Sequence, residues 1–521
     1  MTTIRLTIAL HCLWGVAWFR GRVVNFSVLT LPLKHVKPAI GDIVFVYQVA
    51  LHFFFNFTSF VFFVKMAVDM SYANATMDNG LAQLVTSHVK GVGRMFYIHS
   101  PQDTMFERPE EVPNFFRQSW PYFLIFMVLE HIVLRLKGHK GIRLNDGITS
   151  ISHGIFQECG RLVWRGAESY FYMWIYTNYR IVDLPWDNTL TWYAAAIGVD
   201  FCYYWMHRAC HEVHILWAQH QVHHTSEDFN MGVGIRQSVI QGWCGFIFYL
   251  PLALAIPPAQ FVMHHQFSYL YMFWIHTEAI KSLGPLEYIL NTPSHHRVHH
   301  GSNKYCLDVN YGGVLIIWDR IFGTFRPEID KIQIVYGLIY NQPSFNPLYL
   351  QSFYTGYVVD KFKRFETVGD KFRAIFWGPS WEPGTARLGD EDQKIDIEIR
   401  DKYDVHLPAW CNLYLVAHYA IVFYGFFDLT GRYMGMTPIS VLIFVFYIIA
   451  SLTIIGMLFD NSNCAPLLEV IRCSVLAFFT RSITATNPGL GTSLQLLYVA
   501  SAMFWCMHTL KLLEIKKSKV E

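Results

Sequence analysis

The sequence predicts an all-α fold, namely a polytopic membrane protein with a histidine-rich metal site that faces the cytosol. Apolar residues make up 53% of the 521 residues and charged residues only 15%, against about 25% in soluble chains. Apolar runs of nearly membrane-spanning length recur along the chain. Histidines cluster, with 13 of the 24 between residues 207 and 300. The net charge of +2 gives no indication of a nucleic-acid partner.

The predicted membrane segments are runs of about 20 apolar residues. The first is 43–64, and the aromatic run 161–178 either crosses the membrane or lies at its interface. Pro257-Pro258 separates two apolar runs, which predicts a helical hairpin with arms 239–256 and 258–275. The remaining predicted spans are 120–136, 190–206, 409–427, 440–459, 466–480 and 492–510.

Changes in composition divide the chain into four parts. Residues 1–89 form an N-terminal extension with a membrane segment, and 90–325 form the histidine-rich membrane domain. Residues 326–408 carry charges of both signs and form a polar cytosolic region, either a solvated loop or a small folded unit. Residues 409–521 contain the C-terminal membrane helices and a lysine-rich tail. The ten cysteines include no CxxC pair and indicate buried apolar side chains, not disulfides.

Basic residues in short loops predict the orientation, because they favour the cytosolic side. Arg135, Lys137 and Lys140 follow the span 120–136, and further lysines end the chain. This places the histidine-rich segment and the C-terminus in the cytosol. The last five residues, Lys517-Ser-Lys519-Val-Glu521, match the K-x-K-x-x retrieval pattern of endoplasmic-reticulum membrane proteins, so we expect that location.

Three histidine motifs carry the strongest chemical signal: one HxxxH and two HxxHH. Spacings of three and four place imidazoles on one face of a helix. The eight motif histidines are too many for one four-coordinate zinc and suit two metals, or one six-coordinate metal with a second nearby. Imidazole alone does not distinguish iron, copper and zinc. These eight are His207, His211, His220, His223, His224, His296, His299 and His300.

The motifs lie where apolar runs end, so the predicted metal site is at the membrane edge, open to a lipid chain. His276 ends the second arm of the predicted hairpin and lies at the same edge. A metal transporter is expected to hold its ligands nearer the middle of the bilayer. Oxidation of an unactivated C–H bond needs a redox metal, which favours iron over zinc. Isolated histidines are interpreted as structural: His214, His264, His265 and His295.

The motif series resembles the fatty acid hydroxylase and sterol desaturase superfamily of membrane di-iron enzymes. Within it the sequence is similar to the alkylglycerol monooxygenase family over about residues 90–515. The resemblance is carried by GVDFCYYWMHR (198–208), TSEDFN after the first HxxHH, FWIHTEAI (273–280), NTPSHHRVHHG (291–301) and YGGVLIIWDRIFGTF (311–325). The first 90 residues have no counterpart in this resemblance.

The resemblance implies a function. It assigns the eight motif histidines, with His276 as a further ligand, to a centre of two iron ions. It implies that O₂ hydroxylates the ether-bonded carbon of an alkylglycerol, with electrons from tetrahydrobiopterin, giving a fatty aldehyde and a glycerol derivative. Two alternatives remain: a sterol or fatty-acyl hydroxylase or desaturase of the same superfamily, and a histidine-rich metal transporter or inactive scaffold.

Residues beside the motifs have two interpretations each. Asp200, Glu212 and Glu278 either orient ligand imidazoles through their second nitrogens or are helix-end or interface charges. Nearby aromatic residues either stack on the pterin or form a membrane-interface belt, and the belt is favoured for the set. They are Tyr203, Tyr204, Trp205, Trp217 and Trp274.

Overall fold

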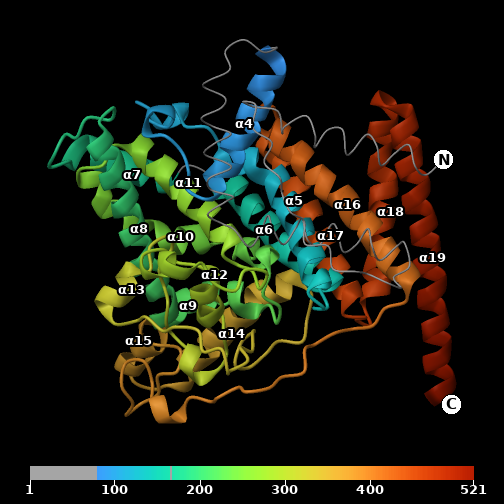
Figure 1. Cartoon of the computed structure of the whole chain (residues 1–521). Coiled ribbons are helices and arrows are strands. Elements are labelled where there is room, and N and C mark those ends of the chain that lie inside the picture. The colour runs from blue at the N-terminus through green and yellow to red at the C-terminus, as the bar shows by residue number, and fades with distance from the viewer. Residues whose placement is uncertain (1–78, 165–166, 521) are drawn as a thin grey trace, which may run out of the picture. The chain divides into compact units, whose positions relative to one another are not determined.

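The fold is helical throughout the part that the computed structural model describes, residues 79–164 and 167–520. These residues contain no β-strand, only the isolated bridges Leu290–Leu315 and Gly301–Tyr336. The prediction of an all-α fold is confirmed (Figure 1). The predicted span 43–64 lies outside the described residues.

Most helices follow one another with short connections, but long ones join α13 to α14 and α15 to α16. The α-helices are α4 (Asn79–Met95), α5 (Phe115–Leu136), α6 (Leu144–Trp164), α7 (Ala167–Tyr179), α8 (Thr189–Glu212), α9 (His214–His220), α10 (Gln241–Gly245), α11 (Pro258–Trp274), α12 (Pro293–His299), α13 (Ile317–Phe322), α14 (Pro347–Arg364), α15 (Val368–Phe376), α16 (Ala409–Arg432), α17 (Pro438–Phe459), α18 (Ala465–Thr486) and α19 (Pro488–Val520). The 3₁₀ helices are η1 (Pro101–Asp103), η2 (Pro109–Glu111), η3 (His223–Thr225), η4 (Met231–Ile235), η5 (Phe246–Leu254), η6 (Gly284–Tyr288), η7 (Lys304–Cys306), η8 (Glu391–Gln393) and η9 (Tyr433–Gly435).

Polar caps and prolines define where the helices start. Asn188 caps α8 by accepting a hydrogen bond from the Leu190 amide. Thr437 caps α17 in the same way, and Pro438 occupies its first turn. Proline is favoured there because its missing N–H would have no partner within the helix. The double proline predicted to break the chain sets the start of α11.

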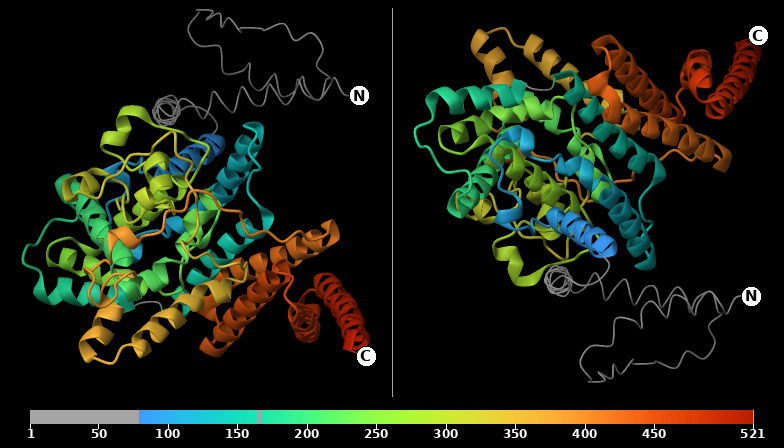
Figure 2. Two further views of the ribbon diagram at one scale, coloured as in Figure 1. Left: turned by 90° about the horizontal axis from the view of Figure 1, so that it is seen from below. Right: turned by 90° about the horizontal axis from the view of Figure 1, so that it is seen from above.

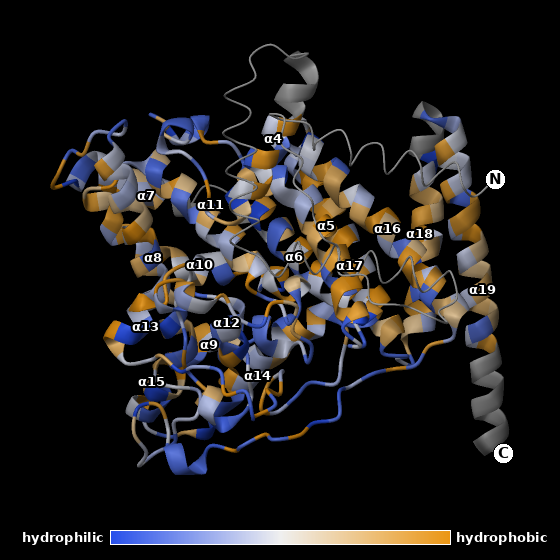
Figure 3. Cartoon of the chain, viewed as in Figure 1, coloured by the Kyte–Doolittle hydropathy of each residue, from blue (hydrophilic) through white to orange (hydrophobic). Residues whose placement is uncertain are grey.

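Four described helices are long and apolar enough to cross a membrane: Pro109–Leu136, Ala409–Gly435, Pro438–Phe459 and Pro488–Leu510. They contain four of the predicted spans, so the chain is a multi-pass membrane protein. Figure 3 shows the hydrophobic colouring concentrated on α16 and α17, whereas the connection from α15 to α16 is hydrophilic. The other predicted spans within the described residues are not among the four: 161–178, 190–206, 239–256, 258–275 and 466–480.

The predicted hairpin at 239–275 takes a different form. Its first arm is the five-residue α10 followed by the nine-residue 3₁₀ helix η5, not one continuous α-helix. Its second arm, α11, is helical but has buried residues on all sides, including Phe267 and Trp274. Hydropathy alone does not separate a lipid-facing helix from one buried in protein, and α11 is of the second kind.

Two apolar cores hold the helices together. The first lies around α5, α8 and α11 and includes Phe123, Met206 and Phe273. The second lies around α6, α16 and α17. Residues 326–408 were expected to be either a solvated loop or a small folded unit. They contain α14 and α15, and α14 packs on α9 and α17.

A buried charged cluster lies among the C-terminal helices. Arg472 and Glu469, both on α18, form an ion pair with N–O distance 2.6 Å and almost no exposure. The same guanidinium lies 2.9 Å from Nδ1 of His418 on α16. The group His418, Glu469 and Cys473 has a spacing that metals accept, but the Arg472 cation already occupies its centre. Figure 2 shows α18 and α19 side by side in both views.

Candidate metal centre

Five short elements bring the nine predicted histidines together. The last turns of α8 carry His207 and His211, and α9 ends at His220. The 3₁₀ turn η3 carries His223 and His224. The remaining four follow α11 or belong to α12 and its C-cap: His276, His296, His299 and His300.

The nine histidines form two adjacent groups. In each group the ligand-capable nitrogens lie within 4.8 Å of one another. The groups touch, because the rings of His224 and His300 are stacked with centroids 4.3 Å apart. Group one contains His207, His211, His220, His224 and His299; group two contains His223, His276, His296 and His300.

All nine imidazoles are buried, with exposures of 6% or less. Burial lowers the pKa of His276 to about 3. For the others with a resolved shift, burial and then the neighbouring imidazoles lower the pKa well below the ordinary value, so these rings are neutral at pH 7. They are His207, His220, His223, His224, His296, His299 and His300.

Backbone carbonyls fix the tautomer of four rings. Nδ1 of His207 lies 2.8 Å from the Tyr311 carbonyl, and Nδ1 of His299 lies 2.9 Å from the Val309 carbonyl. His276 and His223 are held in the same way by the carbonyls of Met272 and Arg236, at 2.6 and 3.2 Å. A carbonyl only accepts, so each Nδ1 donates and each Nε2 keeps its lone pair.

The free lone pairs point at one another. Nε2 of His276 lies 3.1 Å from Nε2 of His223, although both atoms lack a proton. It also lies 2.8 Å from Nε2 of His296. Nε2 atoms of three further rings, His211, His299 and His300, are buried with no hydrogen-bond partner among the described residues. A cation between such lone pairs removes their repulsion, so the donor set fits metal binding.

An ion pair stabilises the segment that holds His223. The Arg236 guanidinium lies 2.8 Å from Asp146 on α6, and both side chains are almost fully buried. Asp146 also accepts a hydrogen bond from Ser226. Burial raises the pKa of Asp146, but Arg236 and Arg143 lower it by more, so it stays ionised. The carbonyl facing His223 is thus held by a buried pair.

The three carboxylates predicted beside the motifs have other partners. Asp200 accepts from the amides of Val314 and Leu315 and from the Trp318 indole. Glu212 pairs with Arg208 and Arg387. Glu278 accepts from Tyr336. Among the described hydrogen bonds none of the three contacts an imidazole. Glu212 is a helix-end charge, whereas Asp200 is buried in the middle of α8 and holds the segment 314–318.

The carboxylate beside a ring is Asp308, which the sequence analysis missed. Its Oδ1 lies 3.6 Å from Nδ1 of His211, and its Oδ2 pairs with Lys394. Burial raises the pKa of Asp308, but His211 and Lys394 lower it by more, below its ordinary value. Asp308 has a positive φ of 58°. It lies nearly a hundred positions from His211 in the chain, so no local pattern linked the two.

Replacing Asp308 by asparagine is expected to weaken metal binding by about tenfold, because outer partners of ligand histidines contribute about 10–100-fold. Titration of the metal-free protein with ferrous iron measures this affinity. An exchange of Asp428 to asparagine, in the exposed pair with Arg432 near the end of α16, serves as the control. Equal affinities for the two variants would contradict the role of Asp308.

Several other residues lie outside both groups. His214 contacts the Ala374 carbonyl through Nδ1, at 2.7 Å, and His264 lies 2.7 Å from the Tyr97 hydroxyl. The aromatic belt interpretation is wrong for buried members of the set, Tyr203, Tyr204 and Trp274. Trp205 is 37% exposed, and the Trp217 ring centroid lies 5.0 Å from that of His211.

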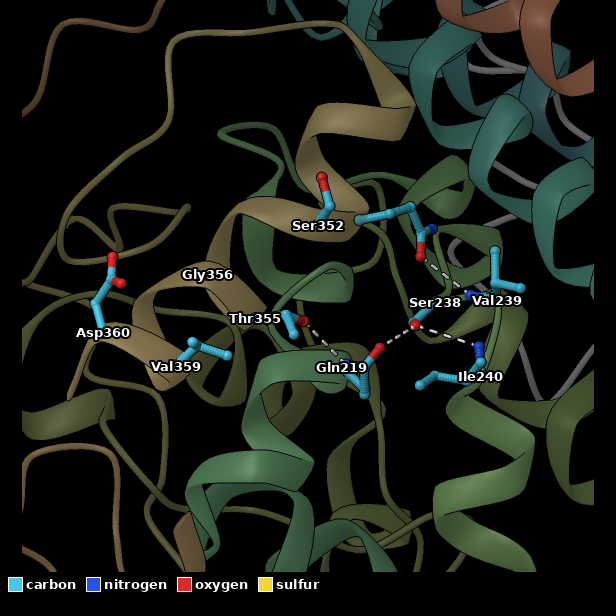
Figure 4. A pocket seen from close by; sticks show the side chains of 10 residues that line it. Gln219, Ser238, Val239, Ile240, Ser352, Thr355, Gly356, Val359 and Asp360 are labelled. Carbon is cyan, nitrogen blue, oxygen red and sulfur yellow. Dashed lines mark hydrogen bonds between the residues drawn. The ribbon is translucent and has the colours of Figure 1, made fainter. Parts of the chain in front are cut away.

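A small cavity of about 30 Å³ adjoins both groups. Besides histidines it is lined by Tyr203, Met206, Gly234, Gln237, Gln241, Tyr269 and Met272. A larger, open hollow of about 530 Å³ lies between α14 and the segment 238–240. There Gln219 and Ser238 face each other and are hydrogen-bonded at 2.9 Å (Figure 4). The segment 237–241 thus contributes residues to both hollows.

Fold and site together define a helical, multi-pass membrane protein with a buried site of nine histidines. The fatty acid hydroxylase family matches residues 192–324, which contain all nine. The alkylglycerol monooxygenase C-terminal domain matches residues 411–496. The chain belongs to the alkylglycerol monooxygenase family.

Three relatives illustrate the similarity. The chain is 41% identical to alkylglycerol monooxygenase of Homo sapiens over 439 residues, 84% of this chain and 98% of the relative. It is 42% identical to that of Xenopus tropicalis over 393 residues, 75% and 88% of the two chains. Ornithine lipid hydroxylase of Rhizobium tropici is 31% identical over 148 residues, 26% and 43%. No solved structure gives a significant match.

Proposed function

We propose that this protein is an O₂-dependent glyceryl-ether monooxygenase. It hydroxylates the ether-linked carbon of an alkylglycerol, and the product separates into a fatty aldehyde and a glycerol derivative. The observation that carries the proposal is the pair of adjacent groups of neutral, converging imidazoles beside a buried cavity. The curated relatives of the same family are named for this activity.

The two groups are proposed to hold two iron ions, one each. Group one offers five imidazoles and group two offers four, and neutral imidazole is a good ligand for ferrous iron. Bound iron supplies the binding and reduction of O₂. The residues of the chain hold the iron through Nε2, fix the ring orientation through Nδ1, and exclude bulk water from the site.

The reaction requires two electrons and two protons besides O₂. One oxygen atom enters the C–H bond and the other leaves as water. Tetrahydrobiopterin is proposed as the electron donor and is oxidised to the dihydro form. The lone pair of the ether oxygen stabilises the carbon centre beside it, which favours that position over mid-chain carbons. The hydroxylated ether is a hemiacetal, whose hydroxyl proton moves to the leaving oxygen as the C–O bond breaks.

The membrane setting suits this substrate. Alkylglycerol is proposed to enter from the lipid, because α8, which carries His207 and His211 in its last turns, also exposes an apolar stripe along its length. The stripe consists of Leu190, Tyr193, Ile197, Phe201 and Trp205. Met206 and Met272 give the cavity beside the histidines an apolar wall. We further propose an endoplasmic-reticulum location, with the site and the C-terminus in the cytosol.

Aldehyde release from a labelled alkylglycerol tests the proposal. Membranes that contain the full chain are expected to release the aldehyde only when tetrahydrobiopterin and O₂ are both present. Removal of iron by a chelator should stop the release, and added ferrous iron should restore it.

The alternatives predict other outcomes. A sterol or fatty-acyl enzyme of the same superfamily releases no aldehyde from an alkylglycerol, even with iron bound. Release without the pterin but with another reductant would overturn the assignment of the electron donor alone.

A further inference from the structure

The cavity beside the histidines contains an acceptor with no partner. Gln241, the first residue of α10, is 5% exposed and lines the cavity. Its Nε2 is directed toward Cys210 Sγ, at 3.6 Å. Its Oε1 is buried and has no hydrogen-bond partner among the described residues. Buried polar atoms in folded proteins are nearly always paired, so this oxygen is available to a hydrogen-bond donor, from water or from a ligand, that enters the cavity.

The neighbouring glutamine differs in this respect. Gln237 also lines the cavity, but it is only partly buried, and its Oε1 is not one of the buried side-chain atoms without a partner. Gln241 is therefore the lining amide whose carbonyl oxygen remains available. Histidines of both groups also line the cavity. A ligand that contacts Gln241 therefore lies beside the proposed metal ligands.

We propose that Gln241 Oε1 accepts a hydrogen bond from a glycerol hydroxyl of the substrate and so determines which carbon faces the histidines. This inference rests on the proposed function. An amide oxygen needs a donor, and neither an alkyl chain nor an ether oxygen provides one. The hydroxyl groups are the donors of an alkylglycerol, and they lie only a few bonds from the ether-linked carbon.

A matched substrate and variant pair tests this role. The substrates are an alkylglycerol and two analogues, each lacking one glycerol hydroxyl, and the variant is Gln241→Met, which keeps the side-chain length. The wild-type protein should lose about tenfold in kcat/KM on one analogue, because an enzyme group that binds a hydroxyl is left unpaired. Gln241→Met should lose about tenfold on the parent substrate and should no longer distinguish that analogue from it.

Gln260→Met is the control. Gln260 on α11 is fully buried and its Oε1 also has no partner among the described residues, but it does not line the cavity. Its Nε2 donates to the Trp186 carbonyl at 2.7 Å. This variant should discriminate among the three substrates as the wild type does.

Binding to the metal-free protein separates this inference from the proposed function. The parent alkylglycerol should raise the Tm of the wild type more than the analogue does, and Gln241→Met should show equal shifts. If the wild type releases no aldehyde, the proposed function fails and these shifts still decide hydroxyl recognition. The role of Gln241 would be overturned if Gln241→Met distinguished the analogue from the parent substrate as strongly as the wild type does, in turnover or in Tm.

Discussion

Replacing His223 by alanine is expected to abolish aldehyde release and to remove iron from group two. Nε2 of His223 contacts Nε2 of His276. The His223 ring packs edge to face against the His300 ring, with ring centroids 4.5 Å apart. Loss of a residue that hydrogen-bonds to a ligand histidine lowers metal affinity by about 10–100-fold. Loss of the ligand itself should therefore lower the affinity by more. Iron content per protein and aldehyde release, measured on the same purified sample, check the result.

His214→Ala is the matched control for this experiment. His214 is fully buried, lies close to His211 in the chain, and belongs to neither group. Its replacement should leave the iron content unchanged and reduce stability through the lost contacts with the Ala374 carbonyl and with the rings of Tyr354 and Tyr357. Full iron content and full activity in His223→Ala would contradict the assignment of group two.

Replacing Arg472 by methionine is expected to destabilise the C-terminal helices by about 3–5 kcal/mol, because it leaves the Glu469 carboxylate buried without its counter-charge. Glu469 is 0% exposed and also accepts a hydrogen bond from the Tyr414 hydroxyl. Unfolding in detergent, followed by circular dichroism, measures the change.

Two further variants establish the cause. The double exchange Arg472→Met with Glu469→Leu removes both charges and should recover most of the loss. Arg432→Met removes a cation from the exposed pair with Asp428 at the end of α16, which is expected to contribute at most about 1 kcal/mol. Equal losses for Arg472→Met and Arg432→Met would show that burial of the Arg472 pair does not matter.

The histidine groups show what local spacing predicts well. Because spacings of three and four place rings on one face of a helix, the sequence already indicated which histidines converge, but the adjacent histidines of each HxxHH motif belong to different groups. The assignment to two groups was not predictable. Group one combines His207 of α8 with His299 of α12, and this pairing depends on how distant helices pack. The ligand roles themselves, and the boundaries of the four predicted parts, stay predictions.

The surroundings of the site were harder to predict because backbone carbonyls fix the tautomers. The carbonyls of Tyr311, Met272 and Arg236 carry no side-chain signature. Carboxylates close to the motifs in the chain, such as Asp200, were therefore the predicted partners, but Asp200 binds backbone amides. Hydropathy likewise identified α16 and α17 as spans but not the buried character of α11, because apolar helices in lipid and in protein have the same composition.

The order of the histidines along the chain has a consequence for biosynthesis. Both groups contain residues from the beginning and the end of the segment 207–300: group one needs His299 and group two needs His300. A ribosome-bound chain that stops short of α12 therefore lacks a ligand of each group. If the groups hold iron as proposed, iron loading is a late step. It follows membrane insertion of α5 and the closure of the long segment between His207 and α12. Newly made protein then passes through a metal-free stage in which the buried imidazoles of both groups are available to competing cations.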